Sequence, residues 1–166
     1  VHRWSDVNPA WPAQEIKLYG PGADSGTFDY FTAEINGEEG ASRSDYTQSE
    51  DDNSLVQGVS ADRNALGYFG YAYYEQNKDR LKPVQVDGGQ GCVEPTQQTI
   101  ADGSYKPLSR PLFVYVSKEA LKRPEVDAFF QFYLDNVTTL VGDVGYIPLP
   151  TARLEKSKQA LAAAAG

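Results

Sequence analysis

The segment LYGPGADSGTFDYF, residues 18–31, places Ser25, Gly26 and Thr27 directly after a glycine-rich stretch. Such a stretch before a helix is suited to three kinds of chemistry. It can hold the phosphates of a nucleotide, present a serine nucleophile to a general base, or bind an anion at the first turn of the helix. The rest of the sequence must decide among these three kinds of site.

A nucleotide site is the first alternative. Gly20 and Gly22 follow a predicted strand, as in the Gly-x-Gly-x-x-Gly turn of dinucleotide-binding proteins. However, Ser25 occupies the place of the third glycine, Pro21 stiffens the turn, and a Gly-Lys-Ser/Thr loop occurs nowhere in the sequence. A nucleotide-dependent enzyme that uses the turn at residues 20–22 therefore remains only as an alternative.

A serine nucleophile is the second alternative, and it needs a base within hydrogen-bond reach. The only histidine of the sequence is His2, close to the amino-terminal end, and we expect it to be a surface residue. A Ser-x-x-Lys pattern in a matching context is also missing from the sequence. We therefore predict no catalytic residue in this chain.

An anion site fits the segment best. We expect a helix to begin at or just after Ser25. The backbone N–H groups of its first turn lack partners within the helix, and the helix dipole places partial positive charge there. Gly26 allows an anion to approach the backbone, and the hydroxyls of Ser25 and Thr27 add two donors. The alternative is that Ser25 is an ordinary N-cap and that the glycines only form a turn.

Arg43 is a second candidate for anion binding. It is the only arginine between Arg3 and Arg63, and it lies beside Asp45 in the segment SRSDYT. A guanidinium group can grip two oxygens of a phosphate, while Asp45 can orient that group or accept a proton from a protonated phosphate. The alternative is a surface arginine that pairs with one of many nearby acids, an interaction that is common and weak.

The periodicity of the chain predicts alternating strands and helices, which is typical of an α/β fold. Strands are predicted in residues 15–20, at the start of residues 64–81, in residues 81–88 and in residues 109–117, the last being the strongest strand pattern. Helices are predicted from Ser25 to Ile35, in residues 49–62, late in residues 64–81, and in residues 122–145 and 151–166. Residues 41–53 are predicted to be polar and loop-like up to the start of a helix, and residues 87–106 to form a long loop.

Two of these helices carry clear end signals and apolar faces. Ser49 or Asp51 is expected to cap the helix in residues 49–62, and its inward face is expected to consist of Leu55, Val56 and Val59. Pro124 is expected at the start of the helix in residues 122–145, and its apolar face is expected to be formed by Val126, Phe129, Phe130, Tyr133, Leu134 and Val137.

Composition excludes several classes of function. A length of 166 residues suits one domain or one and a half, and 40% hydrophobic residues are enough for a core. A formal charge of -8 argues against a nucleic-acid surface. Cys92 is the only cysteine, so the chain has neither an internal disulfide nor a cysteine-based metal site, and SEDDN does not match a calcium loop. We therefore expect no metal and no cofactor, and no apolar run is long enough to span a membrane.

Four segments together resemble the phosphate-binding proteins of bacterial ABC-type phosphate uptake systems, the PstS family. They are IKLYGPGADSGTFDYFTAEI, SRSDYTQSEDDNSLVQGV, ALGYFGYAYY and YKPLSRPLFVYV, in the right order across nearly the whole chain. The resemblance implies an α/β type 2 periplasmic-binding-protein fold. Residues 1–105 would be one complete lobe, and residues 106–166 would be the crossover strand and carboxyl-terminal helices of the other lobe.

The resemblance also implies a function without enzyme chemistry. The protein would be an extracytoplasmic or periplasmic component that captures inorganic phosphate and delivers it to the permease subunits of an ABC importer. Its ligand-binding residues would be Ser25, Gly26, Thr27, Arg43 and Asp45. A binder of sulfate or another oxyanion with the same fold is the alternative.

The resemblance has two gaps. The early phosphate-binding loop of the family's first lobe has no match here, so we expect the missing amino-terminal lobe of the same protein as a partner, with any lipid anchor upstream of Val1. Many family members have arginine where this chain has Pro21, so Arg43 is expected to supply the positive charge instead.

Overall fold

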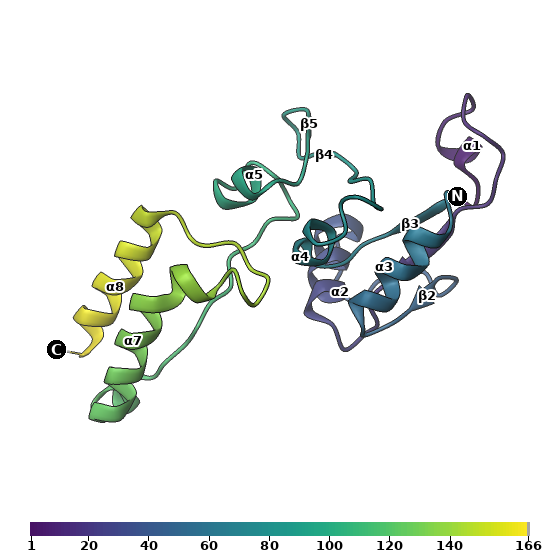
Figure 1. Cartoon of the computed structure of the whole chain (residues 1–166). Coiled ribbons are helices and arrows are strands. Elements are labelled where there is room, and N and C mark those ends of the chain that lie inside the picture. The colour runs from purple at the N-terminus through teal and green to yellow at the C-terminus, as the bar shows by residue number, and fades with distance from the viewer. Residues whose placement is uncertain (166) are drawn as a thin grey trace. The chain divides into compact units, whose positions relative to one another are not determined.

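The computed structural model describes residues 1–165 of the chain, which divides into two compact units, Val1–Val84 and Gln85–Gly166 (Figure 1). Its mixture of helices with a parallel sheet confirms the predicted α/β class. The division at residue 84 describes compactness only, so the assignment of residues 1–105 and 106–166 to two lobes stays a prediction.

The first unit is built on a three-stranded parallel sheet in the order β2-β1-β3. The strands are β1 (Lys17–Gly20), β2 (Thr47–Gln48) and β3 (Ala65–Gly67). The predicted strands at residues 15–20 and at the start of residues 64–81 are confirmed. The loop predicted for residues 41–53 is wrong at β2, whose two residues are polar and exposed and therefore show no apolar alternation. Pairing with the backbone of β1 makes them a strand.

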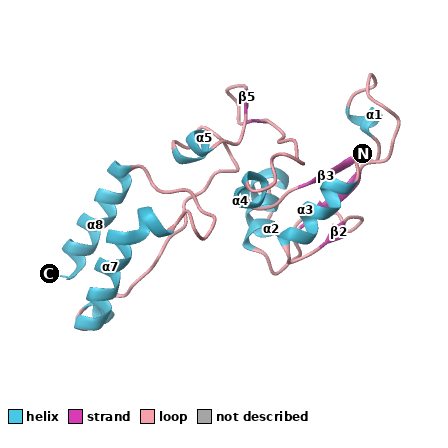
Figure 2. Cartoon of the chain, viewed as in Figure 1, coloured by secondary structure: helices cyan, strands magenta, loops and turns pink. Residues whose placement is uncertain are grey.

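The first unit also contains helical segments, shown in cyan in Figure 2, of which α3 packs against β1 and β3. They are α1 (Trp4–Val7), α2 (Gly26–Phe31), the π-helical turn η1 (Thr32–Asn36), α3 (Asp52–Ala61) and α4 (Tyr71–Glu75). Three predicted helices are thus confirmed. Asp51 is the cap of α3, and its side chain accepts a hydrogen bond from the N–H of Asn53.

Helix α3 packs against β1 and β3, and the core of the first unit includes buried residues of α2 and α3. Leu55 and Val56 are only 1% and 2% exposed, as expected for the inward face of α3, and Phe28 of α2 is also buried. Helix α3 approaches β1 so closely that a Cβ placed on Gly58 would lie 2.2 Å from the Tyr19 ring. Glycine at this position therefore allows the helix to pack on the strand.

The second unit begins with a short hairpin, β4 (Val86–Asp87) and β5 (Cys92–Val93), which is followed by α5 (Gln97–Ala101). The strand predicted in residues 81–88 is therefore confirmed only at its end. The loop predicted for residues 87–106 is wrong because the Asp87 carboxylate accepts the N–H groups of Gly89 and Gly91 and closes the hairpin. Thr96 then caps α5 through a capping box.

The strand predicted for residues 109–117 is also wrong. Residues 110–116 have no regular secondary structure, and Leu112, Phe113 and Tyr115 are 60%, 69% and 86% exposed. A strand needs a neighbour to pair its N–H and C=O groups. Within residues 1–165 no strand pairs with this segment.

The unit ends with α6 (Lys118–Leu121), α7 (Pro124–Leu140) and α8 (Thr151–Ala165). Both long helices are confirmed, and Pro124 opens α7 as expected. Leu121 and Leu154 are buried where α6 meets α8. The apolar face of α7 is only partly covered, since Phe129 is 57% exposed and Tyr133 is 37% exposed.

Candidate functional site

The chain turns from β1 into α2 at the edge of the sheet where all three parallel strands end, which we call the carboxyl edge. The strands end there at Gly20, Gln48 and Gly67. In open α/β sheets, ligands bind beside this edge because the loops and helix starts that follow the strands gather there. The predicted Ser25, Gly26 and Thr27 lie at the start of α2, which follows β1 after five residues.

Ser25 is the N-cap of α2. Its backbone is extended, with φ -99° and ψ 124°, and its Oγ accepts the N–H of Thr27 at 3.2 Å. The carbonyl of Ser25 accepts the N–H of Asp29 at 3.1 Å. Ser25 is therefore an N-cap, as the alternative to an anion site expects. This cap leaves the anion alternative open, because a hydroxyl that accepts one hydrogen bond can still donate its own proton.

The turn between β1 and α2 is buried, which is unusual for a connecting segment. Gly20, Pro21 and Gly22 are all buried. A Cβ on Gly20 would lie 2.7 Å from the ring of Tyr68 and 3.2 Å from the ring of Tyr46. These two rings leave no room for a side chain at Gly20, so this position requires glycine.

Two tyrosines and one glutamate thus belong to the surroundings of the turn, and no pattern in the sequence indicates any of the three. The hydroxyl of Tyr46 donates to the carbonyl of Pro21 at 3.0 Å. Tyr68 stacks on Phe31 of α2 with ring centroids 3.9 Å apart. Glu50 reaches the turn from the loop after β2, and its Oε1 would lie 2.1 Å from a Cβ on Gly22. A Gly-Pro-Gly sequence signals a turn, but it does not say which side chains cover that turn.

The electrostatics of these groups follow from their surroundings. Burial raises the pKa of Tyr68 to about 12, and the neighbouring Tyr46 adds to this effect. Tyr68 is therefore an uncharged phenol at neutral pH. At the start of α3, a hydrogen bond from the backbone N–H of Asn53 and another from the Ser54 hydroxyl lower the pKa of Asp51. The carboxylate of Asp51 is thus held in its charged form at a helix start.

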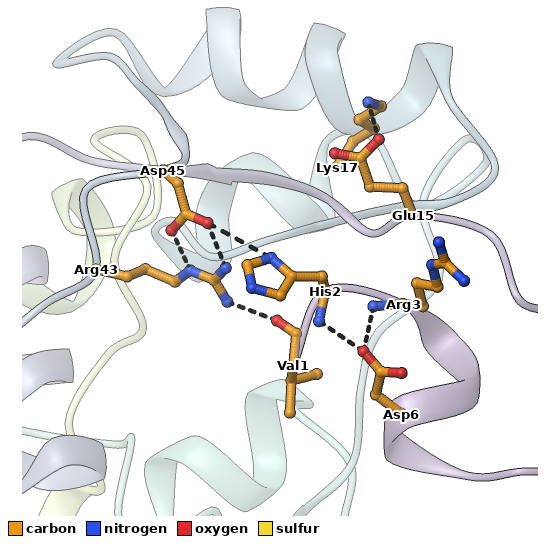
Figure 3. Close-up of polar contacts among 8 residues, drawn as sticks. All are labelled: Val1, His2, Arg3, Asp6, Glu15, Lys17, Arg43 and Asp45. Carbon is orange, nitrogen blue, oxygen red and sulfur yellow. Dashed lines mark hydrogen bonds and ion pairs between the residues drawn. The ribbon is translucent and has the colours of Figure 1, made fainter.

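Arg43 and Asp45 form a forked ion pair in the loop before β2 (Figure 3). The Arg43 Nε donates to Oδ1 of Asp45 at 2.5 Å, and a terminal nitrogen of Arg43 donates to Oδ2 at 2.6 Å. The other terminal nitrogen donates to the carbonyl of Val1 at 3.1 Å. The Arg43 guanidinium lowers the pKa of Asp45 to about 2, chiefly through its side-chain hydrogen bonding to the Asp45 carboxylate. Nδ1 of His2 lies 3.8 Å from Asp45.

The structure does not bring Arg43 and Asp45 to the start of α2. Gln48 pairs with Gly20 in the sheet and Thr47 pairs with Tyr19, so Asp45 lies two residues before the amino end of β2. Ser25 follows the opposite, carboxyl end of β1. Figure 3 accordingly shows the pair beside Val1 and His2, in a view that also holds the ion pair of Lys17 with Glu15.

The arrangement offers hydroxyl and backbone donors rather than a metal centre. Among residues 1–165, no three His, Cys, Asp or Glu side chains lie close enough to hold a metal ion. Cys92 is a free, exposed thiol in the second unit. None of the helices in this range is both long enough and apolar enough to cross a membrane.

Comparisons with known proteins give this geometry a context. A family model described as a PBP superfamily domain matches residues 1–137. Protein SphX of Synechocystis sp. is 53% identical over 149 residues, which are 89% of this chain and 44% of that protein. The phosphate-binding protein PstS of Staphylococcus saprophyticus is 43% identical over 149 residues, which are 89% of this chain and 46% of that protein.

Solved structures agree with the fold. The crystal structure of a possible phosphate binding protein from Planctomyces limnophilus is 47% identical, with a TM-score of 0.85 over 100% of this chain and 60% of that chain. PstS from Borrelia burgdorferi gives a TM-score of 0.61 at 18% identity, over 91% of this chain and 59% of that one, and shows the fold alone. The chain spans less than half the length of the curated relatives named above.

Proposed function

This chain belongs to the PBP superfamily, and from that membership we propose that it is part of a solute-binding protein that captures inorganic phosphate and delivers it to an ABC importer. One observation carries the proposal. The Ser25-Gly26-Thr27 start of α2 lies at the carboxyl edge of a parallel sheet, in a chain 43% identical to a protein named for phosphate binding.

Ser25, Gly26 and Thr27 are the proposed phosphate contacts. The Ser25 Oγ already accepts the N–H of Thr27, so its own proton is directed away from that bond and is available to an oxyanion. Gly26 carries no side chain that would shield the backbone from the anion. Partial positive charge at the helix start favours an anion here, and that charge needs no nearby lysine or arginine.

Arg43 and Asp45 enter the proposal as a pair. Both carboxylate oxygens of Asp45 accept from the guanidinium of Arg43, which suits an orienting role better than that of a proton acceptor. Since the pair lies toward the amino end of β2, Arg43 contributes its charge to the anion at the carboxyl edge only after a movement of this loop. Arg43→Ala in a phosphate titration tests whether such a movement matters.

The assignment of the chain to lobes, its location and its partners are proposed from the family. Residues 1–105 would form the second, anion-binding lobe, and residues 106–166 would be the crossover strand and carboxyl-terminal helices of the first lobe. The amino-terminal part of the same protein would supply the rest of that first lobe and complete the cleft. The proposed location is periplasmic or otherwise extracytoplasmic. One form of this proposal attaches the protein to the membrane through a lipid anchor upstream of Val1. The proposed partners are the permease subunits of the importer, without nucleic acid, and the protein itself would catalyse no reaction.

The test is a titration of the ¹⁵N-labelled chain, followed by NMR, with phosphate, sulfate and NAD in parallel. One lobe supplies only part of the contacts of a cleft, so we expect weak binding, with a dissociation constant of about 1 mM or above, which corresponds to about 4 kcal/mol or less. Phosphate should shift the amide signals of Gly26 and Thr27 in a saturable manner. Saturable shifts with sulfate but not phosphate would indicate another oxyanion, and shifts with NAD alone would indicate a nucleotide site.

A pair of matched variants separates the anion site from helix capping. Ser25 caps α2, and Ser117 caps α6 of the second unit by accepting the N–H of Ala120 at 3.1 Å. Ser25→Ala and Ser117→Ala should each lower stability by about 1 kcal/mol, the usual effect of a lost cap. Only Ser25→Ala should weaken phosphate binding. Equal affinity of the two variants would remove Ser25 from the site.

A further inference from the structure

The buried turn before α2 depends on a single side chain for its hydrogen bonding. Gly20, Pro21 and Gly22 are buried, so their carbonyl groups need partners within the protein. The Gly20 carbonyl accepts the N–H of Ser49 at 3.2 Å, and the Gly22 carbonyl accepts the N–H of Ser25 at 3.2 Å. Both of these donors are backbone groups, which no substitution other than proline removes.

The carbonyl of Pro21 has a different kind of donor. It accepts the hydroxyl of Tyr46 at 3.0 Å, and Tyr46 lies 25 residues away, immediately before β2. The ring of the same tyrosine also packs against Gly20, at 3.2 Å from the position of a Cβ on that glycine. Tyr46 therefore holds the middle of the turn by its hydroxyl and the beginning of the turn by its ring.

Tyr68 holds the other side of Gly20. Its ring carbons Cε1 and Cζ lie 2.7 Å and 3.2 Å from the position of a Cβ on Gly20, and its ring stacks on Phe31 of α2. Its hydroxyl, in contrast to that of Tyr46, is buried without a hydrogen-bond partner among the described residues. The ring of Tyr68 thus links the turn to α2, while its hydroxyl contributes no bond to the turn.

We propose that Tyr46 and Tyr68 are positioning residues for the anion site, because together they fix the turn at residues 20–22 that aims the Ser25 end of α2. Tyr46 acts through its hydroxyl, and Tyr68 acts through its ring. This inference rests on the proposed phosphate function. Neither tyrosine needs to touch the anion.

The different roles of the Tyr46 hydroxyl and the Tyr68 ring predict how three variants behave, with phosphate affinity measured by the NMR titration with inorganic phosphate. Tyr46→Phe keeps the ring but leaves the buried Pro21 carbonyl without its donor, so phosphate affinity should fall about tenfold. Tyr68→Phe keeps the ring and removes only a hydroxyl without a partner among the described residues, so this variant should be at least as stable as the wild type. Tyr68→Leu removes the stacked ring, so affinity should fall as for Tyr46→Phe.

Tyr71→Phe is the matched control. Its hydroxyl donates to Oε2 of Glu75 at 2.8 Å, within α4 of the same unit, and not to a carbonyl of the turn. Phosphate affinity should therefore be that of the wild type in this variant, although it also loses a hydrogen bond of a tyrosine. All affinities are measured at a temperature at which thermal melts show each variant fully folded.

A second measurement does not depend on phosphate. Hydrogen exchange of the Ser25 N–H, which is bonded to Gly22, reports directly on the turn. It should be faster in Tyr46→Phe and Tyr68→Leu, and unchanged in Tyr68→Phe and Tyr71→Phe. Faster exchange in a chain that binds no phosphate would overturn the proposed function and keep the positioning role. Wild-type exchange and wild-type affinity in Tyr46→Phe would overturn the positioning role itself.

Discussion

Residues 16–20 and residues 112–116 have similar apolar patterns, IKLYG and LFVYV, but only the first stretch forms a strand. The first stretch contains β1, which pairs with β2 on one side and β3 on the other. The second has the stronger β-forming composition, with valine and aromatic residues, and yet has no partner among residues 1–165 and remains largely exposed. The difference teaches that pairing and burial, rather than composition, decide which apolar stretch becomes a strand.

The same contrast extends to the residues around each stretch. Helix α3 packs against β1 and buries Leu55 and Val56 almost completely. Among the described residues, no comparable layer covers residues 112–116, where Phe113 is 69% exposed. Substitutions near β1 should therefore change the free energy of unfolding strongly, and equivalent ones at residues 112–116 should change it little.

The largest effect is expected for Leu55→Ala. Removing a leucine side chain that is 1% exposed leaves a cavity and should lower the free energy of unfolding by about 2–5 kcal/mol. Leu112→Ala is the control, since its side chain is 60% exposed and the change should be within about 0.5 kcal/mol. Urea denaturation followed by circular dichroism measures both variants. A large loss at Leu112 would show that residues 112–116 are packed in solution, and the contrast between the two stretches would fail.

A second effect is expected where α3 approaches β1. Gly58→Ala places a methyl group 2.2 Å from the Tyr19 ring, so either the helix or the ring must shift, at a cost of about 1–3 kcal/mol. Gly142→Ala meets no atom of residues 1–165 within 4 Å and should have a far smaller effect. The measurement is the same urea titration. Similar midpoints for the two variants would mean that the contact between helix and strand is looser than the structure has it.

The sequence was informative about helices and about β1, and the reasons are local. Asp51 and Pro124 mark helix starts by their own chemistry, and the spacing of Leu55 and Val56 reports the face that packs inward. β2 could not be found in this way, because Thr47 and Gln48 are polar and become a strand only through pairing with β1. Composition likewise suggested a strand at residues 112–116, where no described strand supplies the pairing.

The candidate site was predictable to a similar extent. The cap at Ser25 follows from its position before a helix, and the pairing of Arg43 with Asp45 follows from their closeness in sequence. The separation of Ser25 from the pair of Arg43 and Asp45 could not be foreseen, since it depends on the register of β2. Tyr46 and Tyr68 reach the turn from distant segments, and no local pattern announces such a contact.

A third prediction compares Tyr68, beside β1, with Tyr115, which is 86% exposed. Burial raises the pKa of Tyr68 from 10.0 to about 12. A raised pKa means that the folded state favours the protonated phenol. The corresponding stability is therefore fully present below pH 10.0 and is lost as the pH rises toward about 12.

Unfolding midpoints measured from neutral pH to the alkaline limit test this prediction. The wild type and Tyr115→Phe should lose stability together in the alkaline range. Tyr68→Phe should lose less there, since it has no phenol to ionise. Parallel curves for all three proteins would mean that the Tyr68 hydroxyl is not buried in solution.

The smallest effect on stability is expected at the ion pair before β2, the strand that gives β1 one of its two neighbours. Arg43 holds the pKa of Asp45 at about 2, below the ordinary value of 3.8. A lowered pKa means that the stability from this pair is present above pH 3.8 and is lost as the pH falls toward about 2. Because both side chains are largely exposed, water and salt screen the pair, and its loss should hardly move the unfolding midpoint.

The influence of Arg43 on the pKa of Asp45 should instead be visible in the titration of the Asp45 carboxyl group. Carboxyl ¹³C signals of the wild type should place the Asp45 midpoint near pH 2, and Arg43→Met should return it toward 3.8, because the forked hydrogen bond is gone. Backbone pairing between Tyr19 and Thr47 does not involve either side chain, so β2 should persist in the variant. If Arg43→Met also loses the protection of the β1 and β2 amides from exchange, the ion pair holds β2 on the sheet. An exposed contact would then matter as much for pairing as the buried core does.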